Sequence, residues 1–441
     1  MRRIATYFSA IVAVGCLQIF PAEAVQFLAE ERVTSDTRNC EMTRNPNHSM
    51  AVGRDGTVHL VFWSGDGSLQ TSPAHPTTVW YCRRDPSGRW ARPEIVDDSY
   101  TSQGARVGGR HPALLLRPNG EVRLFWHDYR NCSAAHNWIE NVELYEDVRP
   151  STGSFSPNDL RLTNTLAVHD GDNGYVPQAV AAPTGEIFVA WYDYHFNPNL
   201  ADLFLMRSNA QGIFNLAAPL DTWRVTDVSQ RGNTLSYTLP DVALDASNTA
   251  HLVWTRDNAN GYSVYFGKKY TDGRPMQTTV LSTTGGDFFD PSHITSSPGG
   301  DFYAVWTEHG TLGGNSSLVV QRLRPTRATF DPPLQIVATA SNQKHADVKV
   351  DSLGYLHLAW VDDRNGHDEI FYGLYDPENK ILLSETKVSG GPSVSARPCI
   401  VVGENQAVSI AWMDYRSGVG QIYFRTTQRP AEARSQWPLY R

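Results

Sequence analysis

The stretch that decides the fold lies near the C-terminus and reads Ala346-Asp347-Val348-Lys349-Val350-Asp351-Ser352-Leu353-Gly354-Tyr355-Leu356-His357-Leu358-Ala359-Trp360-Val361-Asp362-Asp363-Arg364-Asn365-Gly366. Apolar residues alternate on both sides of a turn at Leu353-Gly354, which is the pattern of a β-hairpin. A polar turn follows the second strand, and residues 369–375 form a further apolar run. The stretch therefore predicts three short antiparallel strands.

The same unit recurs along the chain. Each copy has one strand, a turn that contains Gly or Asn, and a second strand that ends on a tryptophan: Trp63, Trp126, Trp191, Trp254, Trp306, Trp360 and Trp412. From the second copy onward the tryptophans are about 65, 63, 52, 54 and 52 residues apart, close to the roughly 40–50 residues of known blade repeats. Each interval accommodates four short strands. The sequence therefore predicts an all-β fold, a seven-bladed β-propeller of four-stranded blades.

The two ends of the chain predict how the ring closes. After Trp412 only one further strand, residues 421–426, precedes the tail, so the last blade lacks a strand. Residues 27–34 resemble residues 381–388, the expected fourth strand of the sixth unit. We predict that the N-terminal strand completes the last blade, which removes the exposed edges of an open sheet. The propeller would span residues 25–428, followed by a C-terminal tail at 429–441.

The first residues have the pattern of an export signal. Three residues with two arginines precede an apolar run, and Pro21-Ala22-Glu23-Ala24 provides an A-x-A cleavage site. We therefore predict a signal peptide at 1–24 and a secreted or periplasmic protein. Residues 13–16 resemble a weak lipobox, which leaves a lipoprotein anchored through Cys16 as an alternative. No other segment is expected to cross a membrane.

Composition narrows the class of partner. The net charge of −8 argues against nucleic acid and anionic membrane surfaces, which bind basic faces. Val, Thr, Tyr, Phe and Trp are plentiful, as in all-β proteins. We expect a monomer. The four cysteines beyond the signal peptide permit two disulfides in any of three pairings, or four free buried thiols: Cys40, Cys82, Cys132 and Cys399.

One turn carries a family resemblance. Arg83-Arg84-Asp85-Pro86-Ser87-Gly88-Arg89-Trp90 is a degenerate form of the Asp box, S-x-D-x-G-x-x-W, and residues 270–273 and 375–379 occupy similar places. In this the chain resembles the sialidase-like, BNR-type β-propellers of secreted proteins. True sialidases carry an F/Y-R-I-P motif and six blades, and neither is found here. Several lyases and glycosidases of uronic-acid polymers have seven blades, so the resemblance implies a carbohydrate-active protein with a glycan or polysaccharide as partner.

Residues that recur at the same place in many blades predict scaffold. Five of the second strands end in W-x-D/E, and in three of these five an arginine follows two residues after the acid. An Asp that caps a turn and pairs with Arg is the ordinary structural interpretation of such a repeat. His59, His251 and His357 recur within the second strand, and we interpret them as packed histidines between blades.

Residues that depart from the repeat are the candidates for a site. The positions just before each first strand converge on one mouth of the axial channel, where ligand sites concentrate. The catalytic candidates are His48, His111, Tyr175, His345 and Arg397. The candidates for substrate binding are Arg110, Asp290, Glu308 and Trp138.

These residue types suit chemistry on an acidic sugar. Arginine binds a carboxylate bidentately, and histidine and tyrosine exchange protons, as β-elimination by a polysaccharide lyase requires. A glycoside hydrolase would need two carboxylates about 5–10 Å apart, for which Asp290 and Glu308 are candidates. A non-catalytic propeller that binds glycan or protein, and a scaffold without a small ligand, remain the alternatives.

We expect no cofactor. Three converging histidines could instead hold a metal such as zinc. Residues 169–174 contain a D-x-D-N-G run like that of a calcium loop, but they lack its remaining spacing and distal glutamate.

Overall fold

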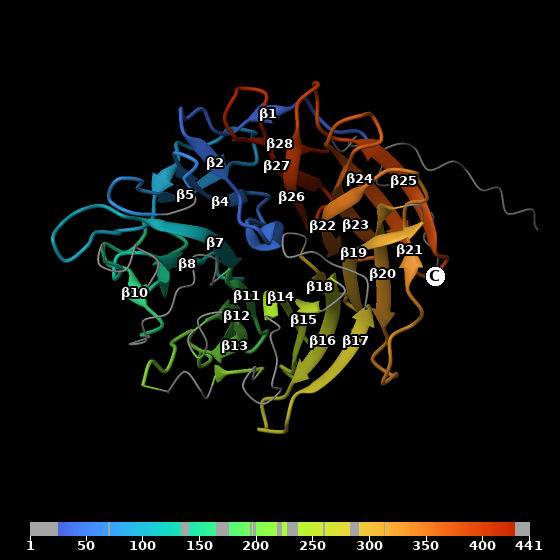
Figure 1. Ribbon diagram of the computed structural model, residues 1–441, viewed down its shortest axis with the longest axis horizontal. Coiled ribbons are helices and arrows are strands. Elements are labelled where there is room, and N and C mark those ends of the chain that lie inside the picture. Colours follow the sequence, from blue (N-terminus) through green and yellow to red (C-terminus); the bar gives the residue numbers. More distant parts are fainter. Residues whose placement is uncertain are drawn as a thin grey trace, which may run out of the picture.

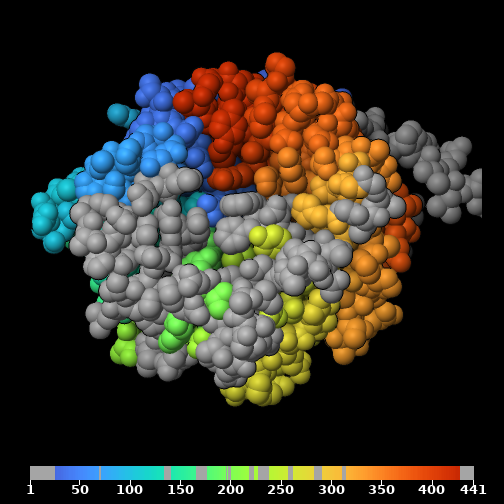
Figure 2. Space-filling model, in the orientation of Figure 1, coloured from blue at the N-terminus to red at the C-terminus, as the bar shows by residue number. Residues whose placement is uncertain are grey.

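The structure, a computed structural model, describes residues 25–68, 71–133, 141–164, 176–194, 196, 200–217, 223–226, 237–258, 261–282, 291–312 and 314–427. These residues form seven antiparallel sheets arranged as blades around one axis, which confirms the predicted seven-bladed β-propeller (Figure 1). In the space-filling view the blades follow one another around the ring in sequence order, so that the first and last sectors meet (Figure 2).

The first three blades are formed by strands from the N-terminal half. Blade 1 contains β2 (Asn39–Glu41), β3 (Met50–Val52), β4 (Val58–Gly65), β5 (Thr78–Arg84) and β6 (Glu94–Ile95). Blade 2 contains β7 (Gly109–Leu116), β8 (Val122–Asp128), β9 (Glu143–Arg149) and β10 (Leu160–Arg161). Blade 3 contains β11 (Gln178–Ala181), β12 (Ile187–Asp193) and β13 (Asp202–Arg207), and a bridge between Phe204 and Arg224 marks the place of a fourth strand.

The remaining blades use the rest of the chain. Blade 4 contains β14 (Tyr237–Leu244), β15 (Ala250–Asn258), β16 (Gly261–Lys269) and β17 (Gln277–Ser282). Blade 5 contains β18 (His293–Ser296), β19 (Phe302–Leu312), β20 (Asn315–Leu323) and β21 (Leu334–Gln335). Blade 6 contains β22 (Gln343–Val350), β23 (Leu356–Asp362), β24 (Glu369–Asp376) and β25 (Ile381–Lys387). Blade 7 contains β26 (Ser395–Val402), β27 (Val408–Asp414) and β28 (Gln421–Thr426), and it is completed by β1 (Glu31–Arg32).

The pairing of β1 with β28 confirms the predicted closure. Glu31 lies opposite Phe424 and Arg32 opposite Tyr423, and a further bridge joins Phe27 to Thr427. The N-terminal strand thus covers an edge that would otherwise be open to pairing with another chain.

The repeated tryptophans form the core of the blades. Trp126, Trp191, Trp254, Trp306, Trp360 and Trp412 are all at most 1% exposed. In five blades the tryptophan ring stacks on an aromatic ring directly opposite it on the third strand, as for Trp191 and Phe204 with centroids 5.3 Å apart. Such cross-strand aromatic pairs stabilise a sheet beyond the area they bury.

The Asp-box-like turn of blade 1 joins this blade to blade 7. The turn after β5 is closed by Asp85, whose Oδ1 accepts hydrogen bonds from Ser87 Oγ and the Arg89 amide. Trp90, which ends this turn, packs edge-to-face on Phe424 of blade 7 with centroids 5.1 Å apart. The same edge-to-face contact recurs at three other seams, in the pairs Phe155–Tyr81, Phe214–Phe125 and Phe330–Phe266. The resemblance to an Asp box therefore marks a structural element of this ring.

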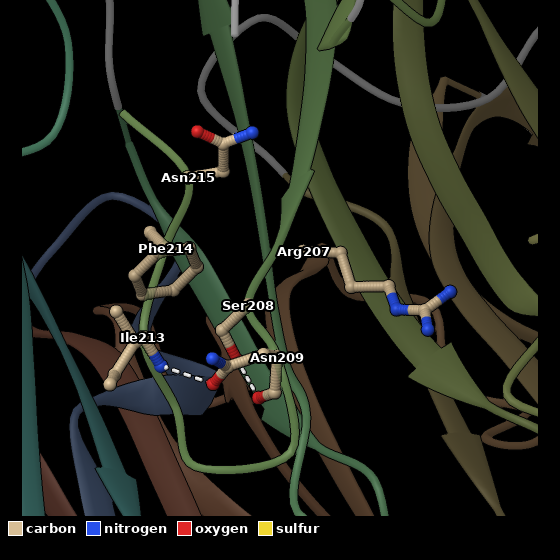
Figure 3. A pocket seen from close by; sticks show the side chains of 6 residues that line it. All are labelled: Arg207, Ser208, Asn209, Ile213, Phe214 and Asn215. Atoms are coloured by element: carbon tan, nitrogen blue, oxygen red, sulfur yellow. Dashed lines mark hydrogen bonds between the residues drawn. The ribbon is translucent and has the colours of Figure 1, made fainter. Parts of the chain in front are cut away.

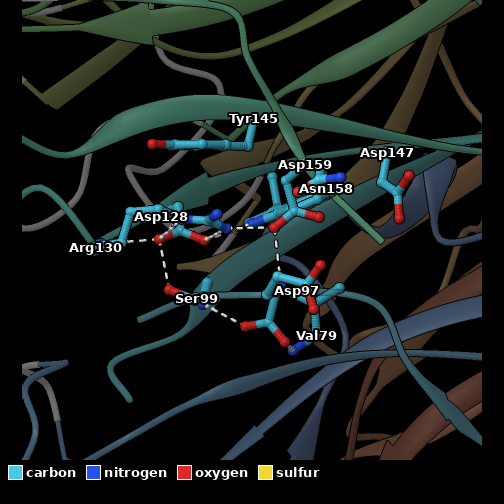
Figure 4. A network of polar contacts seen from close by, with 12 residues as sticks. Val79, Asp97, Ser99, Asp128, Arg130, Tyr145, Asp147, Asn158 and Asp159 are labelled. Atoms are coloured by element: carbon cyan, nitrogen blue, oxygen red, sulfur yellow. Dashed lines mark hydrogen bonds and ion pairs between the residues drawn. The ribbon is translucent and has the colours of Figure 1, made fainter. Parts of the chain in front are cut away.

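The W-x-D/E repeat is scaffold, as predicted. Asp128 accepts hydrogen bonds from Trp126 Nε1, the Arg130 amide and the Arg130 guanidinium. Figure 4 shows its contacts with Arg130 and with Ser99 at the seam of blades 1 and 2. Arg130 also pairs with Asp159 at 2.5 Å. Blades 6 and 7 repeat the pairing in Asp362–Arg364 and Asp414–Arg416.

The structure also decides the predictions about the cysteines and the repeated histidines. Cys40, Cys82, Cys132 and Cys399 are free and buried, so the alternative without disulfides holds. His59, His251 and His357 are buried in the blades, as predicted; His59 and His357 contact tyrosine hydroxyls, and His251 stacks on Phe302 of blade 5. In the described part of the chain, no helix has the length and apolar character needed to cross a membrane.

Candidate functional site at the mouth of the axial channel

The first strands of four blades share an interruption at the mouth. In blades 2, 4, 6 and 7 a bulge places two residues of the first strand opposite one residue of the second, so the register shifts by one residue. The first residue of each bulge has φ near +50°: His111, Leu239, His345 and Arg397. A positive φ is unfavourable for residues other than glycine and is kept only where the surroundings enforce it. Three of the candidates from the sequence, His111, His345 and Arg397, therefore occupy equivalent bulged positions on their blades, and a bulge changes the direction in which a side chain points.

Blade 1 replaces the short bulge with a longer insertion. Glu41 of β2 pairs with Trp63 and Met50 of β3 pairs with Leu60, so residues 42–49 leave the sheet between them. This axial segment, residues 42–49, contains the short 3-10 helix η1 (Pro46–His48). It reaches the centre of the ring, where the blue N-terminal ribbon lies in Figure 1. The axial channel is thus occupied by the protein's own chain.

A group of cationic and aromatic side chains gathers beside this segment. We call it the mouth cluster, and it consists of Arg44, Arg110, His111, His127, Tyr192 and Arg397. The His111 ring lies edge-to-face to His127, with centroids 5.1 Å apart, and to Trp63 at 5.8 Å. His127 in turn contacts Tyr129 at 5.3 Å. His111, His127 and Tyr192 are buried, and they come from blades 2 and 3.

The surroundings of His111 in the cluster keep its imidazole neutral. Burial lowers the pKa of His111 well below its usual value, and the nearby His127, Arg44, Arg397 and Arg110 lower it further. A neutral imidazole can accept a proton, and negative charge from a bound anion would make it a stronger base. The cluster therefore combines a proton acceptor with several fixed positive charges.

The tyrosine and the arginines have defined partners. Burial raises the pKa of Tyr192, opposed by a hydrogen bond with Arg44, so the hydroxyl stays protonated. The Arg397 guanidinium donates to Glu41 Oε2 at 3.1 Å and to the Met42 carbonyl at 3.0 Å. Arg110 lies over the Trp63 ring at 4.9 Å and donates to the Ser68 carbonyl at 2.7 Å.

The structure places the predicted site residues in several environments. Arg110 and Arg397 both lie within electrostatic range of His111. His48 lies in the axial segment, with its Nε2 atom 3.1 Å from Asp241 of blade 4. His345 shares the bulge geometry on blade 6, and its membership of the cluster stays a prediction.

The other candidates are either part of the repeat or undescribed. Glu308 occupies the repeated acidic position, where its carboxylate accepts hydrogen bonds from Trp306 Nε1 and Ser282 Oγ. We therefore leave Glu308 out of the proposed site. Tyr175, Asp290, Trp138 and the calcium-like run 169–174 lie outside the described residues.

Sequence reasoning missed several members of the cluster. His127 and Tyr192 occupy the middle position of the W-x-D repeat, where blades 6 and 7 have Val361 and Met413. This departure from the repeat was a usable signal, because the same comparison singled out His111. Arg44 carried no such signal, since the axial segment has no counterpart in the other blades.

Two further possibilities carry little chemistry. Among the described residues, no group of three His, Cys, Asp or Glu side chains is placed to hold a metal ion. A hollow of about 410 Å³ lies at the turn after β13, lined by Arg207, Ser208, Asn209, Ile213, Phe214 and Asn215 (Figure 3). Phe214 there packs on Phe125 between blades, and Arg207 pairs with Glu186, so this hollow belongs to the scaffold.

Comparison with known proteins confirms the fold alone. No protein-family model and no curated protein sequence matches the chain. Among solved structures, a protein of unknown function from Dyadobacter fermentans is similar at 13% identity and a TM-score of 0.52, over 76% of this chain and 96% of that one. The polysaccharide lyase Uly1 is similar at 9% identity and a TM-score of 0.52, over 87% of this chain and 90% of that one. The NanB sialidase of Streptococcus pneumoniae has a TM-score of 0.47 at 11% identity, over 92% and 71% of the two chains.

Proposed function

We propose that this protein is a carbohydrate-active propeller that cleaves an acidic glycan by β-elimination, with the mouth cluster as its active site. The observation that carries the proposal is the neutral His111 surrounded by the charges of Arg44, Arg110 and Arg397. Positive charge next to a proton acceptor suits a substrate that carries a carboxylate beside an acidic C–H bond. The expected export of the protein, through residues 1–24, would place it where polysaccharides occur.

The roles follow from the chemistry of elimination. Arg397 and Arg44 would bind the uronic-acid carboxylate and stabilise the charge that develops when the C5 proton leaves. His111 would accept that proton, the C4–O bond would break as the C4=C5 bond forms, and the Tyr192 hydroxyl would donate a proton to the leaving oxygen. Tyr175 remains a candidate for the same role as Tyr192.

A lyase fits these residues better than a glycoside hydrolase. Hydrolysis needs a pair of carboxyl groups flanking the scissile bond. Glu41, which contacts the cluster, is already paired with Arg397, and Glu308 is bonded to Trp306 of blade 5 and Ser282 of blade 4. A non-catalytic glycan-binding propeller is the alternative, because the same cations would bind an acidic sugar without turnover.

A screen against uronic-acid polysaccharides tests the proposal, read by ultraviolet absorbance of the unsaturated product and by reducing ends. Elimination raises both signals, hydrolysis raises only the reducing ends, and binding alone raises neither. We expect His111→Ala to lower turnover roughly 10²–10⁴-fold as a lost base, with the same prediction for His345 if it joins the site. His357→Gln, at a buried scaffold histidine, serves as the control. Full activity in His111→Ala would contradict the assignment.

A further inference from the structure

The axial segment is a polar stretch held inside the ring with little support of its own. Thr43, Asn45, Asn47 and Ser49 are each at most 4% exposed. In the described structure, one side-chain oxygen of each has no hydrogen-bond partner, and unsatisfied buried polar atoms destabilise a conformation. The position of the segment therefore depends on the bonds that it receives from the surrounding blades.

Blade 7 holds the start of the segment through Arg397 and the Met42 carbonyl, and three other blades hold the residues that follow. Blade 3 contributes Gln178, whose amide donates to the Asn45 carbonyl at 3.3 Å. Blade 6 contributes Lys349, whose Nζ donates to the Asn47 carbonyl at 3.1 Å. Blade 4 contributes the Pro240 carbonyl, which accepts from Asn45 Nδ2 at 3.1 Å, and the carboxylate of Asp241.

Asp241 makes the greatest number of these contacts. Its Oδ2 accepts from Asn47 Nδ2 at 2.6 Å and its Oδ1 lies 3.1 Å from His48 Nε2. Burial alone would raise the pKa of Asp241, but the imidazoles of His293, at 3.6 Å, and His48, at 3.1 Å, outweigh burial and hold the pKa far below its usual value. The carboxylate is fully buried and charged, which makes its hydrogen bonds strong.

Asp241 also has a scaffold role that blade 6 repeats. It accepts the amides of Val242 and of Ile294, on the first strand of blade 5. Asp347 accepts the corresponding amides of Val348 and of Ile400, on the first strand of blade 7. The two aspartates thus share their links to the next blade. They differ in their other partners: Asp241 bonds the side chains of Asn47 and His48, whereas Asp347 accepts from Lys349, which donates in turn to the Asn47 carbonyl.

We propose that Asp241 is a positioning residue of the mouth cluster: by fixing Asn47 and His48 across the channel, it holds Arg44 beside Tyr192 and His111. The catalytic importance of Asp241 rests on the proposed function, whereas its role in holding the axial segment does not. Arg44 lies three residues before Asn47 in the same segment, so a segment released from blade 4 no longer holds the guanidinium in place.

The test uses the full chain and needs no substrate. We expect Asp241→Asn to increase deuterium exchange in peptides that cover residues 42–49, well above any increase in Asp347→Asn. Asp347 is the control because both variants weaken the same links to the next blade. Asp347→Asn also weakens the hold on Lys349, so any loosening of Lys349 raises exchange in the control and works against the expected difference. Equal increases in both variants would show that the bonds from Asp241 to Asn47 and His48 do not hold the segment, and would overturn the proposal.

A second readout reports on Arg44 itself. The charge of Arg44 lowers the pKa of His111, so displacement of Arg44 should raise that pKa, whereas loss of a carboxylate charge could only lower it. The His111 resonance, identified with His111→Gln in protein labelled at histidine, should titrate at higher pH in Asp241→Asn and in Arg44→Gln, but not in Asp347→Asn. An unchanged or lowered pKa in Asp241→Asn would refute the positioning role. Neither measurement uses turnover. The positioning role of Asp241 can therefore be refuted while the lyase proposal stands, and the lyase proposal can be refuted while the positioning role stands.

Discussion

A carboxylate of the N-terminal strand links the last blade to the first, and its removal tests how the ring is held closed. Glu31 Oε1 accepts from Arg84 NH2 at 2.7 Å, and Oε2 accepts from Arg84 Nε at 2.9 Å and from Trp90 Nε1 at 2.8 Å. The side chains of Arg84 and Glu31 are 12% and 26% exposed, so solvent screens this pair less than a surface pair. Glu31→Ala removes all three bonds.

The expected loss of stability follows from these contacts. A hydrogen bond to a charged group contributes about 1.5–3 kcal/mol. Three bonds share one carboxylate and the pair is partly exposed, so we expect the free energy of unfolding to fall by about 2–3 kcal/mol in total. With an unfolding entropy of about 2.1 cal/mol/K per residue over roughly 400 residues, the melting temperature should fall by about 3 °C.

Calorimetry at neutral pH measures this change, and the chain offers a matched control. Glu404 of blade 7 pairs with Arg54 of blade 1 at 3.1 Å, but the two side chains are 70% and 75% exposed. Glu404→Ala should therefore change stability by less than about 0.5 kcal/mol. If the two variants melt alike, Glu31 does not hold the closure, and the explanation of the seam is wrong.

Three further predictions test the scaffold. Deletion of residues 25–33 should expose the edge of β28 and cause aggregation, visible by size-exclusion chromatography with light scattering; a monomeric deletion variant would contradict the closure. Gly108→Ala should lower the free energy of unfolding by roughly 3 kcal/mol or more, because the new Cβ would lie 2.0 Å from the Thr77 carbonyl oxygen. Gly104 also has a positive φ but has open space around it, so Gly104→Ala should cost only about 1 kcal/mol in the same denaturant titrations. Burial lowers the pKa of His59 and His251 to about 4. The unfolded chain then binds more protons between pH 6.5 and 4, so stability should fall as the pH falls through this window, by at most about 3 kcal/mol per histidine. Urea titrations at pH 7 and pH 4 should show a smaller loss in His59→Gln and His251→Gln, and an equal loss would refute this cause.

The sequence by itself determined the ring. Strands with a fixed side-chain period, turns with Gly or Asn, and a tryptophan at the end of each second strand are local signals, and their repetition specifies both the blade count and the missing strand of blade 7. Recurrence also identified scaffold correctly, as in Asp128 with Arg130 and in the buried His357. These predictions succeeded because the same residue types pack in the same way in each blade.

Only the tertiary structure decided what lies at the mouth. The sequence left open whether the four cysteines are paired, and the structure shows them free. The course of residues 42–49 across the channel and the contact of Arg44 with Tyr192 depend on residues from different blades. The repeat places His111 and Arg397 on equivalent strands, but it says nothing of an insertion without a counterpart or of which side chains fill the axis. The physical reason is that a repeat specifies contacts within a blade and with the next one, whereas Asp241 and His48 are 193 residues apart and meet only because the ring has closed.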